Sequence, residues 1–456
     1  MIMALLGKLE KFLFYFLLFA IPFQTRKILW HQNWNFNEWQ SISIYATDLL
    51  LMVLFVFWAM SALRGRQITN FQFLIFNKLP IFNFQLLKKP NFYLLILVIV
   101  SAISIKNSSS YILSTYNVLK LTEFIAFYFY IKSYAVYKFG FTNSLSVIIA
   151  GGLFQAVIAI LQFLKQSSLG LGLLGESVIS PNLTGIASFY SMAGEKIIRA
   201  YGTTPHPNIL AGYLFLAIFA FYYLWLYKNI SRFYLFAYAL TLLAFFFTFA
   251  RVAVFLLFVN FLIRIILVRL NFRKEYWNKK LALLFLTTFI VVSTFSLVYW
   301  PEAVSRIKIS SGEEAVQLRI FYNKESLSSL NWFGVGSGNF VNWLMVKDPN
   351  LSRNLYQPVH NIYLLIYSEM GILGITAFIL FLIFLIKDFI VKTKMEKLYH
   401  YSFLLVFLSF LFVGLFDHFL WTLQQGRFIL WLSLSILTFY SKDDRMQGQS
   451  DLGFRY

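Results

Sequence analysis

The feature of this sequence that most limits its fold is a series of apolar runs separated by short polar segments. Each run is close to the length that an α-helix needs to cross about 30 Å of hydrocarbon. The sequence therefore predicts one all-α polytopic membrane domain over residues 1–456, with about twelve transmembrane helices. We expect the spans at 12–23, 45–63, 91–106, 111–131, 142–164, 206–227, 232–250, 252–269, 282–300, 371–391, 400–417 and 426–440.

The composition agrees with a membrane protein and argues against a soluble one. Hydrophobic residues make up 59% of the chain and charged residues only 13%, whereas soluble domains carry about 25% charged residues. A net charge of +20 would indicate nucleic-acid binding in a soluble protein. Here the basic residues lie in short loops between apolar runs, so they indicate topology and no nucleic-acid partner is expected. The chain has no cysteine, which excludes disulfides and a thiolate nucleophile.

The distribution of Lys and Arg predicts the orientation in the membrane. Most of the 39 basic residues fall on one side if the N-terminus is inside, and cytoplasmic loops are the ones enriched in Lys and Arg. We therefore expect both termini to be cytoplasmic. Two longer segments would then lie outside: 165–205, and a large loop over 301–370 with short helices before the tenth span. We expect one of these helices to start near Glu314 and another, from 360 to 370, to end at Gly371.

The stretch 232–269 is almost entirely apolar, with Arg251 in its middle. A single helix of this length would measure about 57 Å, which is too long for one crossing. We therefore predict two spans that meet at Arg251 on the outer side, although no Gly or Pro marks the turn.

Histidines and an arginine at span ends are candidates for chemistry. His360 can accept a proton near neutral pH, and on a helix it would share a face with Tyr363. An interfacial His that caps a helix is the alternative. Arg199 precedes a span whose cap and first turn we predict at Thr204 and Pro205, a combination that suits a phosphate. Snorkelling of Arg199 to lipid headgroups is equally compatible. His206 is a second candidate base, but a structural role at the helix start is favoured.

Other charged residues have weaker signals. Arg251 lies between two apolar runs, which is costly without a partner, and Arg319 lies in the large loop, where a solvated face is the default. Lys120 and Glu123 are three residues apart in one span, so an intrahelical ion pair is favoured over catalysis. The pair Asp417-His418, at 417–418, is a weak alternative site. The segment 334–338 (GVGSG) is interpreted as a turn, since it lacks the strand–helix context of a nucleotide loop.

Four segments, in order, resemble the O-antigen ligase and polymerase superfamily of bacterial membrane glycosyltransferases. They are RAYGTTPHPNILAGY from Arg199, which contains His206 and Asn208; FAR at 249–251, with Ala250 where the family usually has Ser; Arg319 followed by NWFGVGSGNF at 331–340; and HNIYL from His360, followed by EMGILG from Glu369. The resemblance covers roughly residues 195–375, and the N-terminal spans match only in hydropathy.

The resemblance implies a metal-independent, inverting glycosyl transfer with no cofactor, on a C-type glycosyltransferase-like fold. The donor would be a glycan on undecaprenyl diphosphate and the acceptor a glycolipid or another glycan. The reaction would take place at the outer face of the cytoplasmic (inner) membrane, in the biosynthesis of envelope polysaccharide such as lipopolysaccharide. His360 would be the base, and Arg199, Arg251 and Arg319 would bind the diphosphate. Supporting roles fall to His206, Asn208, Asn361, Tyr363, Glu369 and Lys120.

Three alternatives stay open at this stage. An O-antigen or capsular polysaccharide polymerase, which joins lipid-linked repeat units, shares the same motifs. A flippase for lipid-linked glycans, or another transporter, would be expected to show paired broken helices near mid-membrane, and none is evident in the sequence. A non-catalytic scaffold would leave the polar residues at the outer span ends unexplained.

Overall fold

The structure of the chain is a computed structural model. It describes residues 2–32, 36–63, 86–228, 230–271, 279–307, 314–329, 331–393 and 398–450. Glu313, the residue before the predicted helix start near Glu314, lies outside these residues.

The described residues are mostly helical, which confirms the predicted fold class at that level. Each of the expected spans coincides with one long helix: α1 (Ile2–Ala20), α2 (Ala46–Leu63), α3 (Pro90–Ser104), α4 (Tyr111–Tyr130), α6 (Phe141–Lys165), α7 (Pro207–Tyr227), α8 (Phe233–Phe247), α9 (Arg251–Asn271), α10 (Lys279–Val298), α14 (Ile362–Thr393), α15 (Leu398–Val413) and α17 (Gln424–Ser450). Among the described residues, 6 helices are long and apolar enough to cross a membrane by length and composition. The count of about twelve spans stays a prediction.

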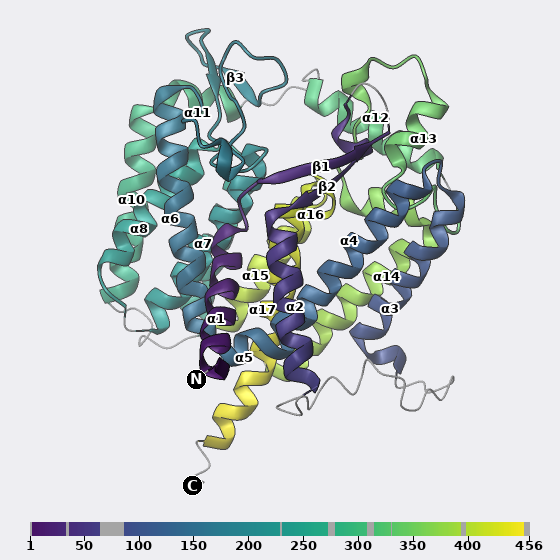
Figure 1. Cartoon of the computed structure of the whole chain (residues 1–456). Coiled ribbons are helices and arrows are strands. Elements are labelled where there is room, and N and C mark those ends of the chain that lie inside the picture. Colours follow the sequence, from purple (N-terminus) through teal and green to yellow (C-terminus); the bar gives the residue numbers. More distant parts are fainter. Residues whose placement is uncertain are drawn as a thin grey trace.

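The long helices form two groups (Figure 1). In one group α6 packs against α1, α7 and α8, and α8 packs against α10. In the other, α3 packs against α14, and α4 and α14 both pack against α17. Helix α15 contacts α7 and α17 and so joins the two groups. Helix α7 is the centre of the core, because 94% of the residues in its most apolar stretch are buried inside the protein.

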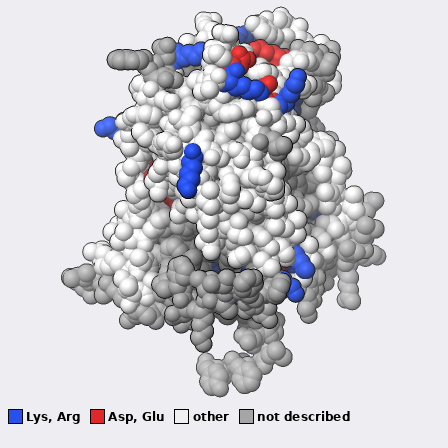
Figure 2. Space-filling view, turned by 90° about the vertical axis from the view of Figure 1, so that its right-hand side faces the viewer, with Lys and Arg blue, Asp and Glu red and all other residues white. Residues whose placement is uncertain are grey.

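The surface of the second group fits a lipid environment. Figure 2 shows a face whose middle is nearly free of Lys, Arg, Asp and Glu, whereas charged side chains gather near its upper edge. Large apolar side chains are exposed on the long helices, among them Leu95 at 57% and Ile383 at 52%. Exposed apolar side chains on span-length helices are expected where lipid tails are the solvent.

The shorter elements collect at one end of the bundle, which we call the loop end (upper part of Figure 1). It carries α11 (Trp300–Ile307), α12 (Glu314–Ser328), α13 (Phe340–Lys347) and two antiparallel hairpins, β1 (Arg26–His31) with β2 (Ser41–Tyr45) and β3 (Ser188–Tyr190) with β4 (Lys196–Ile198). The sequence did not predict these hairpins. Both chain termini lie at the opposite end. The remaining elements are η1 (Glu38–Gln40), η3 (Leu86–Lys88), η4 (Ile105–Asn107), η5 (Ile131–Ala135), α5 (Val136–Phe139), η6 (Gly172–Leu174), η8 (Arg353–Leu355) and α16 (Phe419–Thr422).

Gly371 divides α14 into a short part near the loop end and a longer part that continues into the bundle. Its backbone is non-helical, with φ 72° and ψ −168°. The loop 331–338 fits into this break, since Ile372 N donates to Asn331 O (3.1 Å) and Val335 N donates to Ser368 O (2.9 Å). A Cβ on Gly371 would lie 2.3 Å from the carbonyl of Trp332. The predicted helix end at Gly371 and the predicted turn at 334–338 are therefore confirmed.

The stretch 232–269 forms two helices, as its length predicted. Helix α8 packs on α6, α7 and α10, whereas α9 packs on α7 and α15. The turn contains no glycine; instead Phe249 adopts the left-handed conformation with φ 46°. Its ring packs against Phe189, with ring centroids 4.7 Å apart, and against Phe163, at 5.7 Å. Aromatic packing thus stabilises a backbone conformation that a bulky residue rarely adopts.

Candidate functional site

The N-terminal ends of α7, α14 and α16 and the turn before α9 meet at the loop end of the bundle. Helix α7 begins at Pro207, and His206 is its cap, because His206 Nδ1 accepts a hydrogen bond from Asn208 N (3.1 Å). The prediction of Thr204 and Pro205 as cap and first turn is therefore wrong. The Thr204 hydroxyl donates backwards to Tyr201 O (2.7 Å), so it is not available to the helix amides.

Arg199 ties three of these segments together. Its Nε donates to Thr248 O in the turn before α9 (2.6 Å), and its Nη2 donates to Asn208 Oδ1 (2.6 Å). Asn208 Nδ2 in turn donates to Asp417 Oδ2 (2.7 Å) in the loop after α15. Burial, and then the nearby charge of Arg306, lower the pKa of Arg199 to about 9. Arg199 is therefore a cation at neutral pH, held by a fixed set of acceptors.

Two histidines and two aromatic side chains form a stack beside Asp417. The rings of His360 and His418 meet edge to face, with centroids 4.9 Å apart, and Trp39 meets the other side of His418, also at 4.9 Å. Tyr322 of α12 stacks on His360 with centroids 5.7 Å apart. His418 Nδ1 lies 2.7 Å from Thr422 Oγ1. The His360 ring therefore packs between Tyr322 of α12 and His418, the residue before α16, and Trp39 of η1 packs on His418.

These histidines are neutral at neutral pH. Burial is the main cause that lowers the pKa of His418 to about 3 and that of His206 to about 3. Burial also lowers the pKa of His360, opposed by the charge of Asp417 and assisted by that of Arg319. Burial acts to raise the pKa of the Asp417 carboxyl, but the three histidines and the Asn208 hydrogen bond outweigh it, so this pKa lies below its ordinary value. The arrangement places a neutral imidazole next to an ionised carboxylate.

The predicted arginines lie around the same group. Arg319 Nε donates to Phe416 O (3.3 Å), immediately before Asp417, and its charge acts on His360. Arg251 opens α9 and lies within electrostatic reach of Arg199. Within the described ranges no group of three or more His, Asp or Glu side chains is placed to hold a metal ion. The positive charge that these residues offer to an anion comes from arginines.

The structure thus brings together six of the predicted site residues, and it adds three that sequence reasoning did not place there. The six are His360, Arg199, Arg251, Arg319, His206 and Asn208. The additions are Asp417, His418 and Arg306. Asp417-His418 had a sequence signal as a polar pair at a span end, whereas Arg306 had none.

Asn361 and Tyr363 have structural contacts instead. Asn361 Oδ1 caps α14 by accepting from the amides of Tyr363 (2.9 Å) and Leu364 (3.1 Å). His360 therefore precedes the helix, and the prediction that it shares a helical face with Tyr363 is wrong. The Tyr363 hydroxyl donates to Leu411 O (2.8 Å), on α15.

Lys120 and Glu369 lie apart from the arginines. Lys120 forms the predicted ion pair with Glu123 (3.0 Å) and a second, unpredicted one with Asp48 of α2 (2.6 Å). Glu369 faces the amides of Gly338 and Phe340. Lys120 lines one of the two cavities described next, and Glu369 lines both.

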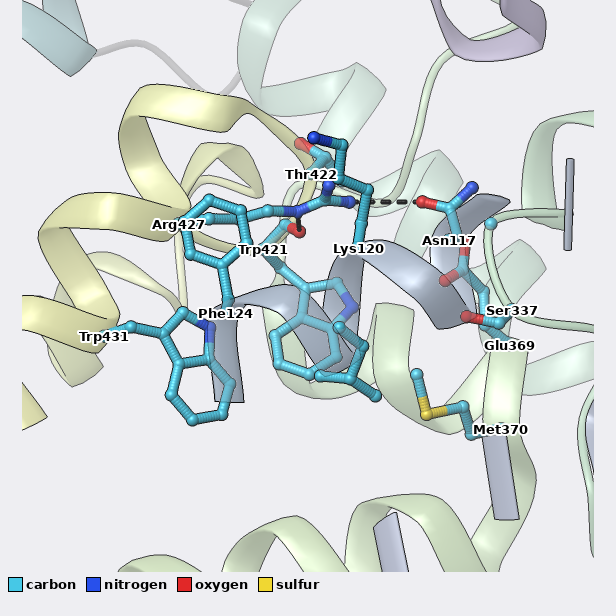
Figure 3. Close-up of a pocket in the computed structure, with 12 residues that line it drawn as sticks. Asn117, Lys120, Phe124, Ser337, Glu369, Met370, Trp421, Thr422, Arg427 and Trp431 are labelled. Atoms are coloured by element: carbon cyan, nitrogen blue, oxygen red, sulfur yellow. Dashed lines mark hydrogen bonds between the residues drawn. The ribbon is translucent and has the colours of Figure 1, made fainter. Parts of the chain in front are cut away.

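Two cavities adjoin the histidine stack. One has about 410 Å³ and the other about 630 Å³ of space, part of which is open to solvent. Their linings share Asn117, Gly338, Glu369, Thr422 and Arg427. Figure 3 shows the first cavity, in which Arg427 reaches across to Asn117, with Nη2 to Oδ1 at 3.1 Å. Because Thr422 lines both cavities and contacts His418, they are continuous with the wall of the histidine stack.

The comparison with known proteins agrees with the resemblance seen in the sequence. No curated protein matches the chain. A sequence model of the O-antigen ligase family matches residues 236–379, from α8 into α14. This range contains Arg251, Arg319 and His360, three of the residues that the fold places in one group. Over these residues the chain is similar to the O-antigen ligase family.

Proposed function

We propose that this protein transfers a glycan from undecaprenyl diphosphate to an acceptor hydroxyl at the outer face of the cytoplasmic membrane, as an O-antigen ligase does. The similarity to this family supports glycan transfer in polysaccharide biosynthesis. The observation that carries the finer proposal is that Asp417 lies near both the neutral His360 and the buried cation Arg199. Arg319 lies near His360, and Arg251 lies near Arg199. A base next to a cationic, enclosed surface is what transfer from a diphosphate requires.

In this mechanism the acceptor hydroxyl gives its proton to His360 as its oxygen attacks the anomeric carbon. The new C–O bond forms on the face opposite the departing oxygen, so the configuration inverts. The bond to the diphosphate breaks, and undecaprenyl diphosphate leaves as an anion. Arg199, Arg251 and Arg319 offset the charge that grows on the leaving group, which is electrostatic stabilisation of the transition state.

Asp417 has a consistent role in this scheme. It is ionised and lies within electrostatic reach of His360, whose conjugate acid it favours. Its charge would therefore stabilise the imidazolium that forms when His360 takes the proton. The hydrogen bond from Asn208, which also accepts from Arg199, fixes the carboxylate relative to the arginines.

The loop end would face away from the cytoplasm, with both termini inside. The loops predicted at the same end of the bundle as the two termini contain most of the Lys and Arg residues, which supports this orientation. Because the chain has no native cysteine, a single cysteine in place of Leu173, which is 92% exposed in the loop before α7, would report the side directly. An impermeant maleimide should label it in intact cells.

The central test is the replacement of His360 by alanine. Purified protein in lipid vesicles would be given a lipid-linked glycan and a labelled acceptor. A general base contributes about 10²–10⁴-fold, so the His360→Ala variant should lose transfer by that factor while it inserts normally. The matched control is His31→Ala, since His31 is exposed on β1 and its ring packs edge to face against Phe36, with centroids 6.2 Å apart. Near-normal transfer by His360→Ala would refute the assignment.

The same assay separates the ligase from a polymerase. Glycan that appears on the labelled acceptor supports a ligase, whereas glycan that lengthens on the carrier lipid supports a polymerase. Movement of the lipid across the vesicle with no new glycosidic bond would support a flippase instead.

A further inference from the structure

The larger cavity lies beside the histidine stack, and the mechanism above does not use it. It is lined by the β1–β2 hairpin, by α4 and by the residues that open α17, and we call it the hairpin cavity. Its space of about 630 Å³ opens in part to solvent, so a ligand can enter it from outside the protein.

The arginines in the hairpin cavity are held by groups of the protein. The lining contains two arginines, Arg26 and Arg427, and two glutamates, Glu38 and Glu369. Arg26 Nη1 donates to Glu38 Oε1 (2.7 Å) and to the Tyr45 hydroxyl (3.1 Å). Arg427 donates to Trp421 O (2.6 Å) and to Asn117 Oδ1 (3.1 Å). A lining that offers both donors and acceptors suits a neutral ligand that both donates and accepts hydrogen bonds.

The remaining lining favours a sugar among neutral ligands. The rings of Trp39, Tyr45 and Tyr116 line the cavity together with the amides of Asn117 and Gln424. Aromatic rings offer flat apolar faces on which the C–H face of a sugar ring can pack. Amide and carboxylate groups, held in place by their neighbours, can pair with its hydroxyls, which are both donors and acceptors.

The wall of the cavity contacts the histidine stack. Trp39 forms part of this wall and meets the His418 ring at 4.9 Å, and His418 meets His360 at 4.9 Å. Thr422 lines the cavity and lies 2.7 Å from His418 Nδ1. Pro358, two positions before His360, lines it as well. A ligand in the cavity would therefore lie next to the histidine stack and apart from Arg199, Arg251 and Arg319, none of which lines the cavity.

We propose that the hairpin cavity binds a neutral sugar of the acceptor glycan and so selects which hydroxyl is presented to His360. This inference rests on the proposed transferase function. Glu38 is the most direct contact, because its side chain is 31% exposed and only one of its oxygens is hydrogen-bonded to Arg26.

The kinetic test compares Glu38→Gln with a matched control. Hydrogen bonds to a charged group are strong, so the acceptor KM of Glu38→Gln should rise about tenfold or more, while the donor KM and kcat stay within about twofold. The control is Glu325→Gln, since Glu325 also belongs to a partly exposed ion pair at the loop end, with Lys347 (2.5 Å), but lines neither cavity. An acceptor KM that Glu38→Gln leaves unchanged would overturn the proposal.

A binding measurement separates this inference from the proposed function. The probe is the neutral oligosaccharide fraction released by mild acid from the envelope glycolipids of the producing cells, titrated into detergent-solubilised protein. The wild type and Glu325→Gln should bind it, Glu38→Gln should bind it about tenfold more weakly, and inorganic pyrophosphate should not displace it. If pyrophosphate displaces the probe, or if the wild type does not bind it, the cavity is not a sugar site. If this pattern holds while the wild type transfers nothing, the proposed function fails and the sugar site stands.

A second variant covers the case in which Glu38→Gln does not fold. Tyr116→Leu removes a flat ring from the cavity wall at a position outside the histidine stack, so it should also raise the acceptor KM and leave the donor KM unchanged. An equal rise in both KM values would show a general disturbance of the site and would overturn the proposal.

Discussion

Replacing His418 with glutamine should remove part of the protein's sensitivity to acid. His418 is 6% exposed, and burial lowers its pKa from 6.5 to about 3. The folded protein therefore keeps this ring neutral between these two values, whereas the unfolded chain takes up a proton. A group whose pKa is depressed in this way makes the free energy of unfolding fall as the pH falls below 6.5, because the unfolded state binds more protons.

The magnitude follows from the two pKa values. At pH 7.5 neither state binds the proton appreciably, so the effect is close to zero. At pH 5 the unfolded state gains about 2 kcal/mol from protonation, while the folded state gains almost nothing. The Asp417 carboxylate does not obscure this window, since its pKa lies below the ordinary 3.8 and it stays ionised throughout.

The measurement is the free energy of unfolding by urea in non-ionic detergent, followed by tryptophan fluorescence at pH 7.5 and pH 5. The wild type should lose about 2 kcal/mol more than His418→Gln over this interval. Glutamine can keep a polar contact with Thr422, which the histidine makes at 2.7 Å, so the variant should fold. His31→Gln serves as the control, because His31 is exposed and should leave the wild-type pH dependence intact. An identical loss in the wild type and in His418→Gln would refute the buried neutral histidine.

Two further substitutions test the geometry of the site and of the fold. Arg199→Lys keeps the charge but cannot reproduce the hydrogen bonds to Thr248 O and Asn208, so transfer should fall by about 10–100-fold. The control is Arg353→Lys at an exposed position, which should leave transfer unchanged. Equal rates in the two variants would contradict the role of the two hydrogen bonds made by the Arg199 guanidinium. Gly371→Ala adds a Cβ 2.3 Å from the Trp332 carbonyl at φ 72°, so its melting temperature should fall well below that of Gly170→Ala, which has a similar φ of 89° but nothing within 4 Å. Equal melting temperatures would show that the loop 331–338 does not need this close approach.

The helices could be predicted because hydropathy and helix length are local properties of the chain. The two-helix interpretation of 232–269 depended only on the length of a membrane span. The turn itself could not be predicted, because Phe249 holds its left-handed backbone through rings that come from distant parts of the sequence. The β1–β2 hairpin was missed for a related reason. Its strands are short, and no local sequence pattern indicates that Arg26 pairs with Tyr45.

The site was predicted as far as single residues can indicate it. A costly arginine or a histidine at the end of a span is visible in the sequence, and this was enough for Arg199, Arg251 and His360. What the sequence does not contain is which of these residues meet. Asp417 contacts Asn208 across 209 positions, and no local pattern links the two. The ion pair between Lys120 and Glu123 was predicted because both residues lie on one helix, whereas the second partner, Asp48, comes from another helix and could not be predicted.

The position of the histidine stack would let the proposed site serve two unlike substrates. Arg199 lies near Arg251 and Arg306, whereas the lining of the hairpin cavity contains two arginines and two glutamates. A diphosphate and a neutral sugar would therefore be drawn to different neighbours of His360. The base must be neutral before the reaction and charged after it, and burial with Asp417 alongside provides both conditions. If the proposals hold, loss of Asp417 should slow proton transfer without changing the binding of either substrate, and an Asp417→Asn variant with a normal kcat but a raised donor KM would place the carboxylate in substrate binding instead.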